Sequence, residues 1–260
     1  MKNIISLSLA SMFLCACTQQ GREVSQDHLL QATLWYQQSA EMAAIYYQCY
    51  HWAGRVLEDK LPQGDFNSPA VVLDIDETIL DNSPQSARQV LCNMPFSDTM
   101  WDEWCSLAEA RALPGALEFT SLAEALGVEV FYISNRGSHL MEVTLVNLRN
   151  AGFPYADSSH VLLKTGSSVK DERRARVAST HEILLLIGDN LGDFSGIYDE
   201  RINGSARENV TREKDLFGER YIILPNPIYG AWEKPYRSSD VSVSLEMKKE
   251  ALEAYVLQKE

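Results

Sequence analysis

Basic residues are scarce in this 260-residue chain. It carries 23 lysines and arginines against 36 aspartates and glutamates, which gives a formal net charge of −13. Binding a nucleic-acid polymer requires a basic face, so the composition argues against such a partner. A small anionic ligand such as a phosphate is not excluded, because a bound cation can invert the field of an acidic site. Internal repeats and low-complexity runs are also absent, and the length suits one elaborated domain or a core with a small insert.

Long hydrophobic runs are absent apart from one near the N-terminus. The apolar stretch Ile4–Leu14 is too short to span a bilayer and leads into a Leu-Cys-Ala-Cys string that closes at Cys17. We interpret residues 1–16 as a signal peptide and the string as a bacterial lipobox, with lipid on Cys17 and a tether over residues 17–27. A plain secretory signal cut nearby is the alternative. The expected location is the bacterial outer membrane, facing the periplasm or the cell surface, with the lipid as the membrane contact.

Cysteine is sparse as well. If Cys17 is lipidated and the residues before it are removed, Cys49, Cys92 and Cys105 remain, an odd number for an oxidising compartment. Cys92 and Cys105 could pair, or each could be a free thiol. No histidine accompanies these cysteines in a nucleophile arrangement, so we assign them no catalytic role.

What the chain does contain is an apolar run that leads directly into carboxylates. The run Ala70–Leu73 precedes Asp74 and Asp76, a pattern typical of a buried central strand in an α/β sheet. Ligands of such sheets bind at the carboxyl ends of the strands, and the i, i+2 spacing points both side chains the same way. Two close carboxylates repel each other or attract a cation, for which Mg²⁺ with its oxygen ligands is the natural choice. Solvated turn aspartates that cap the next helix are the alternative.

Three later apolar strands also end in polar side chains. The strand 128–133 is followed by Ser134 and Asn135, the strand 161–163 by Lys164, and the strand 182–187 by Asp189 and Asp193. The two late aspartates are one helical turn apart, so both can face one site. Lys170 competes with Lys164 as the cation of this site. We prefer Lys164, because it stands at a strand end, whereas Lys170 would belong to a charged helix over residues 169–179.

The remaining segments frame this core. Residues 28–68 show helical periodicity, with Leu30, Leu34 and Tyr47 among the apolar positions, and residues 238–260 form a C-terminal helix whose Leu252 and Val256 are available to pack on them. Residues 69–237 form the core, with a small cap inserted at about 85–113. The predicted fold is therefore α/β, a Rossmann-like parallel sheet with a cap and a helical subdomain built from both termini.

Together, these motifs resemble a known family. The string Asp-Ile-Asp-Glu-Thr at 74–78, followed by Leu-Asp-Asn-Ser-Pro at 80–84, is similar to the first motif of the class C acid phosphatases, the lipoprotein e family of the haloacid dehalogenase (HAD) superfamily. Gln85 stands where that family shows tyrosine. The strings Ile-Gly-Asp-Asn-Leu at 187–191 and Asn-Pro-Ile-Tyr-Gly at 226–230 extend the resemblance over roughly residues 30–235.

The resemblance implies a role for each polar residue at the strand ends. Asp74 would attack phosphorus and form an aspartyl-phosphate, and Asp76 would act first as acid and then as base. Mg²⁺ would be held by Asp74, the backbone carbonyl of Asp76, and Asp189. Ser134, Asn135 and Lys164 would bind the phosphoryl group. Asp193 would orient Lys164 or reach the metal through water.

The expected function is Mg²⁺-dependent hydrolysis of small phosphomonoesters outside the cytoplasm. The resemblance suggests nucleoside 5′-monophosphates and nicotinamide mononucleotide as substrates. Phe96, Trp101 and Tyr229 are candidates to stack on a substrate ring, with packing as their alternative role. Two further alternatives stay open for the whole protein, a non-catalytic surface lipoprotein that binds a ligand or host factor, and a phosphotransferase using the same site. A homodimer is also left open.

Overall fold

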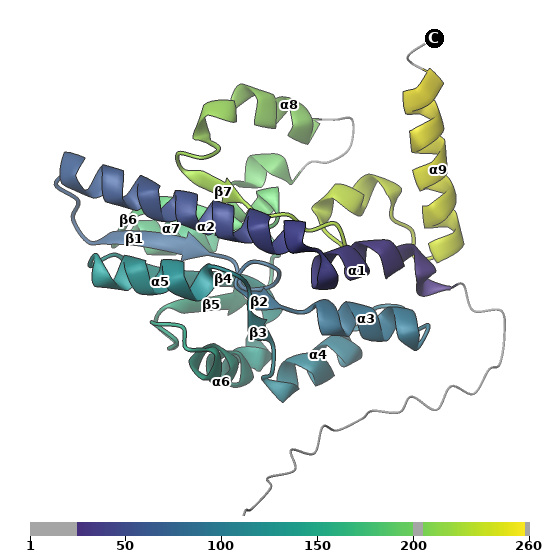
Figure 1. The fold of residues 1–260 in the computed structure, drawn as a ribbon, viewed down its shortest axis with the longest axis horizontal. Helices are drawn as coiled ribbons and strands as arrows, with labels where there is room; N and C mark the ends of the chain where they lie inside the picture. Colours follow the sequence, from purple (N-terminus) through teal and green to yellow (C-terminus); the bar gives the residue numbers. More distant parts are fainter. Residues whose placement is uncertain (1–24, 200–204, 258–260) are drawn as a thin grey trace, which may run out of the picture.

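A five-stranded parallel sheet forms the centre of the protein, seen in the computed structural model of Figure 1, which describes residues 25–199 and 205–257. The strand order is β5-β4-β1-β6-β7, and every neighbouring pair is parallel. The strands are β1 (Pro69–Leu73), β4 (Glu129–Gly137), β5 (Val161–Lys164), β6 (Glu182–Gly188) and β7 (Tyr221–Ile223). The predicted α/β class with a parallel sheet is confirmed. Because the strands are parallel, their carboxyl ends share one edge, with β1 in the middle.

Alternation along β1 places hydrophobic side chains on both faces of the sheet. Val71 and Leu73 belong to one core with side chains of helices α2, α5 and α6, whereas Ala70 and Val72 belong to a second core on the other face. The helices are α1 (Leu30–Gln38), α2 (Ala40–Lys60), α3 (Ser83–Leu91), α4 (Asp98–Leu107), α5 (Ala116–Ala125), α6 (Met141–Ala151), α7 (Asp171–Ala178), α8 (Ser205–Arg212) and α9 (Val241–Leu257). A strand covered on both faces explains why the β1 sequence is apolar throughout.

The N-terminal helical segment is broken at Ser39. The Ser39 hydroxyl accepts a hydrogen bond from the Met42 N–H and caps α2, so α1 and α2 form two helices instead of one. The side chains that α1 and α2 bury include Tyr36, Tyr46 and Tyr50, while Leu30, Leu34 and Tyr47 are more than half or about half exposed. The predicted apolar face at Leu30, Leu34 and Tyr47 is therefore wrong.

The segment between the first two motifs holds helices α3 and α4 and a short antiparallel pair, β2 (Leu80–Asp81) with β3 (Arg111–Ala112). Helix α3 packs on α1, and α4 packs on α6. This helical pair lies beside the carboxyl edge of the sheet in Figure 1.

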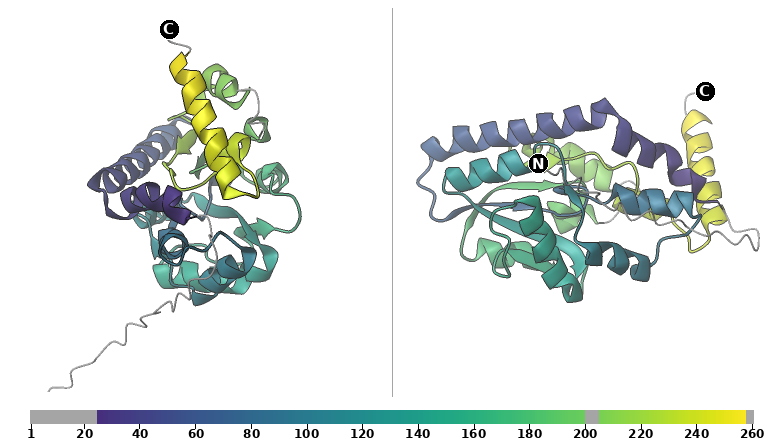
Figure 2. Two further views of the ribbon diagram at one scale, coloured as in Figure 1. Left: turned by 90° about the vertical axis from the view of Figure 1, so that its right-hand side faces the viewer. Right: turned by 60° about the horizontal axis from the view of Figure 1, so that its bottom comes forward.

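Helix α9 stands at one end of the molecule in Figure 1 and in the right-hand view of Figure 2, and it faces the viewer in the left-hand view of Figure 2. It packs against the 3₁₀ helix η8 (Ala231–Tyr236), and Lys248 forms an ion pair with Glu233. Leu252 and Val256 are 69% and 64% exposed, so the prediction that they pack on the N-terminal helices is wrong.

Cys105 is a buried free thiol, so it does not pair with Cys92, and Cys49 is free as well.

Within the ranges 25–199 and 205–257, no helix has the length and hydropathy needed to cross a bilayer. The predicted signal peptide and Cys17 lie outside the described residues.

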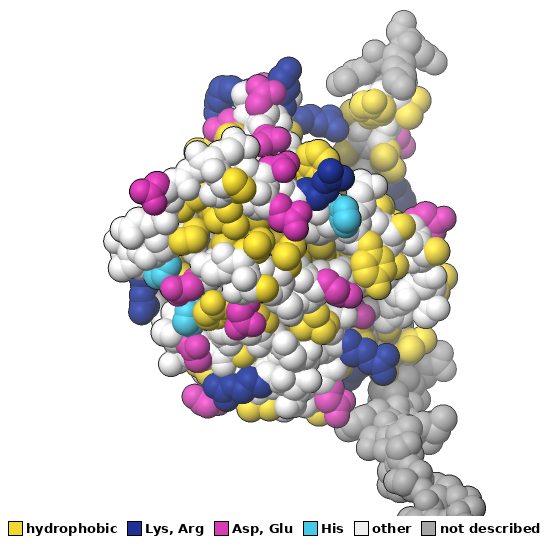
Figure 3. All heavy atoms as spheres, turned by 60° about the vertical axis from the view of Figure 1, so that its left-hand side comes forward, with side chains coloured by type: hydrophobic (Ala, Val, Ile, Leu, Met, Phe, Trp, Pro, Cys, Tyr) yellow, Lys and Arg dark blue, Asp and Glu magenta, His cyan; other side chains and the backbone are white. Residues whose placement is uncertain are grey.

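Acidic and basic side chains are interspersed on the face drawn in Figure 3, around a band of hydrophobic side chains.

Candidate active site

Three carboxylates converge where β1 and β6 end. Asp74 follows β1 and Asp189 follows β6, and the Asp74 N–H continues the strand pairing by donating to the Ile187 carbonyl at 3.0 Å. Asp193 lies on the 3₁₀ helix η4 (Leu191–Asp193) just beyond β6. One oxygen from each of these three carboxylates lies within 4.8 Å of the others. The sequence prediction that the two acidic motifs meet is therefore correct in space.

The glycine of the second acidic motif allows Asp193 to fold back against β6. The Asp193 carboxylate accepts a hydrogen bond from the Asn190 N–H at 2.9 Å, closing a capping box at η4. A Cβ placed on Gly188 would lie 2.3 Å from an Asp193 carboxylate oxygen. Only a residue without a side chain permits this close approach.

Lys170, not Lys164, supplies the ammonium group of the site. Its Nζ contacts Asp74 Oδ1 and lies 2.6 Å from Asp193 Oδ1, and the side chain is buried. Lys170 immediately precedes α7, so the start of this helix carries it to the carboxylates. Lys164 ends β5, the edge strand two positions away from β1. The choice of Lys164 is thus corrected, and Asp193 orients Lys170 instead.

Burial and mutual repulsion act strongly on these carboxyl groups. Burial, with Asp193 and Asp76 adding to it, raises the pKa of Asp74 to about 7 although the Lys170 ammonium acts in the opposite direction. Burial also raises the pKa of Asp189 well above its usual range, again with a contribution from Asp193. Buried carboxylates whose charged forms are disfavoured in this way are suited to receive a cation.

The donor set fits a hard divalent cation. All three convergent groups are carboxylates, and Asp189 is held in place by hydrogen bonds from Asn226 Nδ2 at 2.8 Å and Thr78 Oγ1 at 3.4 Å. Oxygen ligands of this kind are those that Mg²⁺ and Ca²⁺ take in proteins. Asp74 and Asp189 therefore form a candidate divalent-metal site, with Asp193 beside it.

The Asp76 side chain points to a different set of partners. Its carboxylate accepts hydrogen bonds from Arg136 Nε at 2.9 Å and Nη2 at 2.8 Å, from Asn82 Nδ2 at 2.9 Å, and from the Ser134 hydroxyl at 3.0 Å. Arg136 is 1% exposed, so the pair is a charge-assisted contact inside the protein. The prediction that the i, i+2 spacing points both carboxylates the same way is therefore wrong, because the Asp76 carboxylate turns to Arg136 whereas the Asp74 carboxylate turns to Lys170 and Asp189.

Arg136 and Asn82 were missed by the sequence analysis. Residues 134–136 lie where the β4–β5 register shifts, and the irregular backbone turns the Arg136 side chain toward Asp76. Asn82 is brought to Asp76 by the turn after it, in which Glu77 has a positive φ of 56° and its buried carboxyl accepts the Asn82 N–H at 2.8 Å. The available signal was an arginine two residues after a strand-end serine.

Two of the three candidate stacking residues lie together near Asp76. The Trp101 ring lies 5.8 Å from the Arg136 guanidinium carbon, and the Phe96 and Trp101 ring centroids are 6.4 Å apart. Phe96 is half exposed. Tyr229 lies in the segment that follows β7. Its backbone N–H donates to the side chain of Asn226, the residue that holds Asp189. The structure therefore places Phe96 and Trp101 on the Asp76 side and the backbone of Tyr229 on the Asp189 side.

Asn135 and Asn226 border the rest of the site. The Asn135 side-chain oxygen accepts a hydrogen bond from Arg173 Nη2 at 2.7 Å, and Arg173 also donates to the Ser134 carbonyl at 2.5 Å. Arg173 lies on α7 three residues after Lys170. It adds a second cation that the sequence analysis did not assign.

On the Asp189 side of the site, Asn226 lines a cavity of about 650 Å³ together with residues of α1 and with Pro225 and Pro227.

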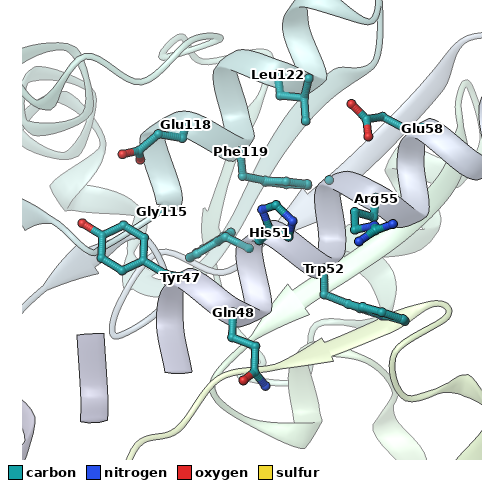
Figure 4. Close-up of a pocket in the computed structure, with 12 residues that line it drawn as sticks. Tyr47, Gln48, His51, Trp52, Arg55, Glu58, Gly115, Glu118, Phe119 and Leu122 are labelled. Atoms are coloured by element: carbon teal, nitrogen blue, oxygen red, sulfur yellow. The ribbon is translucent and has the colours of Figure 1, made fainter. Parts of the chain in front are cut away.

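A separate hollow of about 630 Å³ lies between α2 and α5. Figure 4 shows it lined by Tyr47 and Trp52 from α2 and by Glu118, Phe119 and Leu122 from α5. None of the convergent carboxylates borders this hollow. The chemistry-bearing groups therefore belong to the sheet edge and not to this hollow.

A family model and two solved structures that resemble this chain are all those of acid phosphatases. A family model described as "HAD superfamily, subfamily IIIB (Acid phosphatase)" matches residues 6–232. The structure is similar to that of the class C acid phosphatase from Bacillus anthracis, with a TM-score of 0.82 and 40% identity over 86% of this chain and 96% of that one. A second structure of the Bacillus anthracis enzyme, with tungstate bound, gives a TM-score of 0.81 and 39% identity over the same shares of the two chains.

Curated relatives are more distant. Acid phosphatase 1 from Solanum lycopersicum is 32% identical over 64% of this chain, and a stem 31 kDa glycoprotein from Glycine max is 29% identical over 61%. The matched regions span 60% and 58% of the lengths of these two relatives.

Proposed function

This chain belongs to the acid phosphatases of HAD subfamily IIIB, and from that membership we propose that it hydrolyses small phosphomonoesters through an aspartyl-phosphate on Asp74. The observation that carries the proposal is the placement of Asp74. Its carboxylate lies at the end of the central strand, in contact with the Lys170 ammonium and within reach of the same cation as Asp189. A nucleophile there would meet a phosphoryl group whose charge is neutralised on several sides.

In the first step, an Asp74 oxygen forms a bond to phosphorus while the bond from phosphorus to the leaving oxygen breaks. Asp76, in its protonated form, transfers that proton to the leaving oxygen, so the alcohol departs neutral. In the second step, the Asp76 carboxylate takes a proton from water as the water oxygen bonds to phosphorus and the Asp74–phosphorus bond breaks. Phosphate leaves, and both carboxyl groups return to their starting state.

Cations and hydroxyls around Asp74 would hold the phosphoryl oxygens. Lys170 takes the role first predicted for Lys164, and the Ser134 hydroxyl and Asn135 amide complete the set with Arg173 nearby. The Bacillus anthracis relative with tungstate bound supports an oxyanion site, because tungstate is a tetrahedral oxyanion like phosphate. Asp74 and Asp189 would hold Mg²⁺, which supplies further charge neutralisation when it is bound.

We also propose that the preferred leaving groups are alcohols that carry an aromatic ring. Phe96 and Trp101 on one side and Tyr229 on the other could stack on a nucleobase or pyridine ring, as in nucleoside 5′-monophosphates and nicotinamide mononucleotide. Stacking of this kind contributes ~1–3 kcal/mol per base in proteins that bind single-stranded nucleic acids.

We also propose an extracytoplasmic location. It rests on the Leu-Cys-Ala-Cys string that ends at Cys17, which we propose as the lipidated residue of a protein anchored in a bacterial outer membrane.

The test is a panel of phosphomonoesters, measured as phosphate release with Mg²⁺ and after chelation. The proposal expects release from nucleoside 5′-monophosphates, nicotinamide mononucleotide and glycerol phosphate, with the ring-bearing substrates preferred and chelation abolishing all three. Absence of release from every substrate in the presence of Mg²⁺ would overturn the proposed activity. Equal kcat/KM values for the ring-bearing and ring-free substrates would overturn the stacking assignment alone.

A further inference from the structure

We propose that Asn82 and Trp104 are positioning residues that fix the Asp76 carboxyl group in the orientation needed for proton transfer to the leaving group. The inference rests on the proposed role of Asp76 as the acid. It concerns two side chains that do not themselves touch the phosphoryl site. Asn82 is 1% exposed and follows Asp76 by six residues, and Trp104 reaches Asn82 from helix α4.

The orientation of the Asn82 amide is dictated by its neighbours. Its oxygen faces Trp104 Nε1 at 2.8 Å and Arg136 Nη2 at 3.4 Å. An indole N–H and a guanidinium can only donate hydrogen bonds, so the group facing them must be the amide oxygen. The amide NH₂ is then turned the other way, where Nδ2 donates to Asp76 Oδ1 at 2.9 Å. Trp104 thus determines which end of Asn82 meets Asp76.

This contact makes the two oxygens of Asp76 unequal. Oδ1 accepts from Asn82 Nδ2 and from Arg136 Nε and Nη2, all at 2.8–2.9 Å. Oδ2 has the Ser134 hydroxyl at 3.0 Å and a longer contact of 3.3 Å to Arg136 Nε. An oxygen that receives three N–H donors has little room for a proton of its own, whereas a hydroxyl can rotate to accept instead of donate. Oδ2 is therefore the oxygen that carries the proton to the leaving group.

Trp104 also connects this orientation to the helix that faces the leaving group. Trp101, three residues earlier on α4, lies over the Arg136 guanidinium, and Phe96 packs against Trp101. Helix α4 therefore carries both Trp101, which is proposed to meet the substrate ring, and Trp104, the donor that orients Asn82. The nucleophile is set independently, because Asp74 is held by Lys170.

The first test is Trp104→Phe, which removes the indole N–H and keeps most of the apolar ring. Glycerol phosphate and 4-nitrophenyl phosphate should respond differently. An alkoxide needs a proton to leave, whereas nitrophenolate leaves without one. We expect kcat/KM for glycerol phosphate to fall by about tenfold, the effect of one lost buried hydrogen bond, and kcat/KM for 4-nitrophenyl phosphate to stay within about twofold. The loss should appear in kcat and not in KM.

Trp52→Phe is the matched control. Trp52 Nε1 donates to the Gly218 carbonyl at 2.7 Å on the outside of α2, so the variant loses the same kind of bond far from Asp76. It should leave both substrates at wild-type rates. Equal losses of kcat/KM on the two substrates in Trp104→Phe would show a general structural effect and overturn the proposal.

Asn82→Ala provides the second test and replaces the first if Trp104→Phe fails to fold. It should lower kcat/KM for glycerol phosphate at least as much as Trp104→Phe, again with little change for 4-nitrophenyl phosphate. In the double variant, Trp104→Phe should add nothing to Asn82→Ala, because Trp104 acts through Asn82. Additive losses of kcat/KM in the double variant would show that Trp104 does not act through Asn82 and would overturn the proposal. If the wild-type protein hydrolyses neither substrate, the proposed function fails and not this inference.

Discussion

Each of the two aspartates after β1 has its own cation. Asp74 contacts Lys170, and Asp76 is paired with Arg136. A buried charge left without a partner is costly, so these pairs hold in place carboxylates that would otherwise repel each other. The separation also assigns different chemistry to the two groups, with Asp74 turned toward the acidic cluster and Asp76 toward the α4 side of the site.

The lysine assignment gives the first prediction. Lys170→Ala should lower kcat/KM by about 100-fold or more, the range seen when a group that stabilises developing charge is removed. Lys164→Ala, at the end of the edge strand β5, is the control and should remain close to wild type. Steady-state kinetics on a single phosphomonoester decides between them. If Lys164→Ala had the larger effect, the original assignment from the sequence would be restored.

The metal gives the second prediction. Asp189→Ala should abolish measurable Mg²⁺ binding in a calorimetric titration, because it removes a direct ligand. Asp193→Ala should weaken the binding by about 10- to 100-fold, the usual cost of removing a supporting group. Activity lost on chelation should return with added Mg²⁺ in Asp193→Ala. The opposite ranking of the two variants would exchange the roles of these aspartates.

At the scale of elements, helix α2 supports the turn that follows Asp76. Tyr50 donates from its hydroxyl to the Thr78 carbonyl at 2.7 Å, and Tyr46 donates to the Glu77 carbonyl at 2.5 Å. Both rings are buried, and burial raises the pKa of each hydroxyl well above its usual range, so both are neutral donors. These bonds satisfy backbone carbonyls of a turn that includes the positive φ of Glu77.

Tyr50→Phe should therefore lower the free energy of unfolding by ~1–3 kcal/mol, because the Thr78 carbonyl would stay buried without its donor. Tyr47→Phe, one turn away on the exposed side of α2, should change it by less than ~0.5 kcal/mol. Urea unfolding of the two variants provides the comparison. Equal effects would mean that α2 supports the fold only through apolar packing.

The strands were predictable from the sequence and the long-range partners were not. Apolar runs bounded by polar residues located β1, β4, β5 and β6 within a few residues, because strands buried on both faces must be apolar. Asp74 and Asp189 followed from those runs. Lys170 and Arg136 did not, because their side chains reach the site through the start of α7 and through an irregular end of β4. The exposed face of α1 was missed because Tyr36 and Thr33 are buried in place of Leu30 and Leu34.

At the scale of the whole molecule, the candidate catalytic residues lie along one edge of the sheet. The expected lipid anchor, Cys17, precedes the described residues. Cys17→Ser should move the protein from the membrane fraction to the soluble fraction, or leave its signal sequence uncleaved, because no thiol remains to carry lipid. Fractionation and mass spectrometry of the mature N-terminus provide the readout, with Cys49→Ser as the control. An unmodified N-terminus in the wild-type protein would contradict the lipid anchor.

The central claim is that Asp74 forms a bond to phosphorus. The most direct measurement is acid quenching during turnover of a phosphomonoester, followed by mass spectrometry of the peptide that contains Asp74. The account predicts phosphate on Asp74 in the wild-type protein, none in Asp74→Asn, and loss of steady-state turnover in that variant to below about 1% of wild type, as expected for a lost nucleophile. Wild-type turnover by Asp74→Asn, or phosphate trapped on another residue, would contradict it.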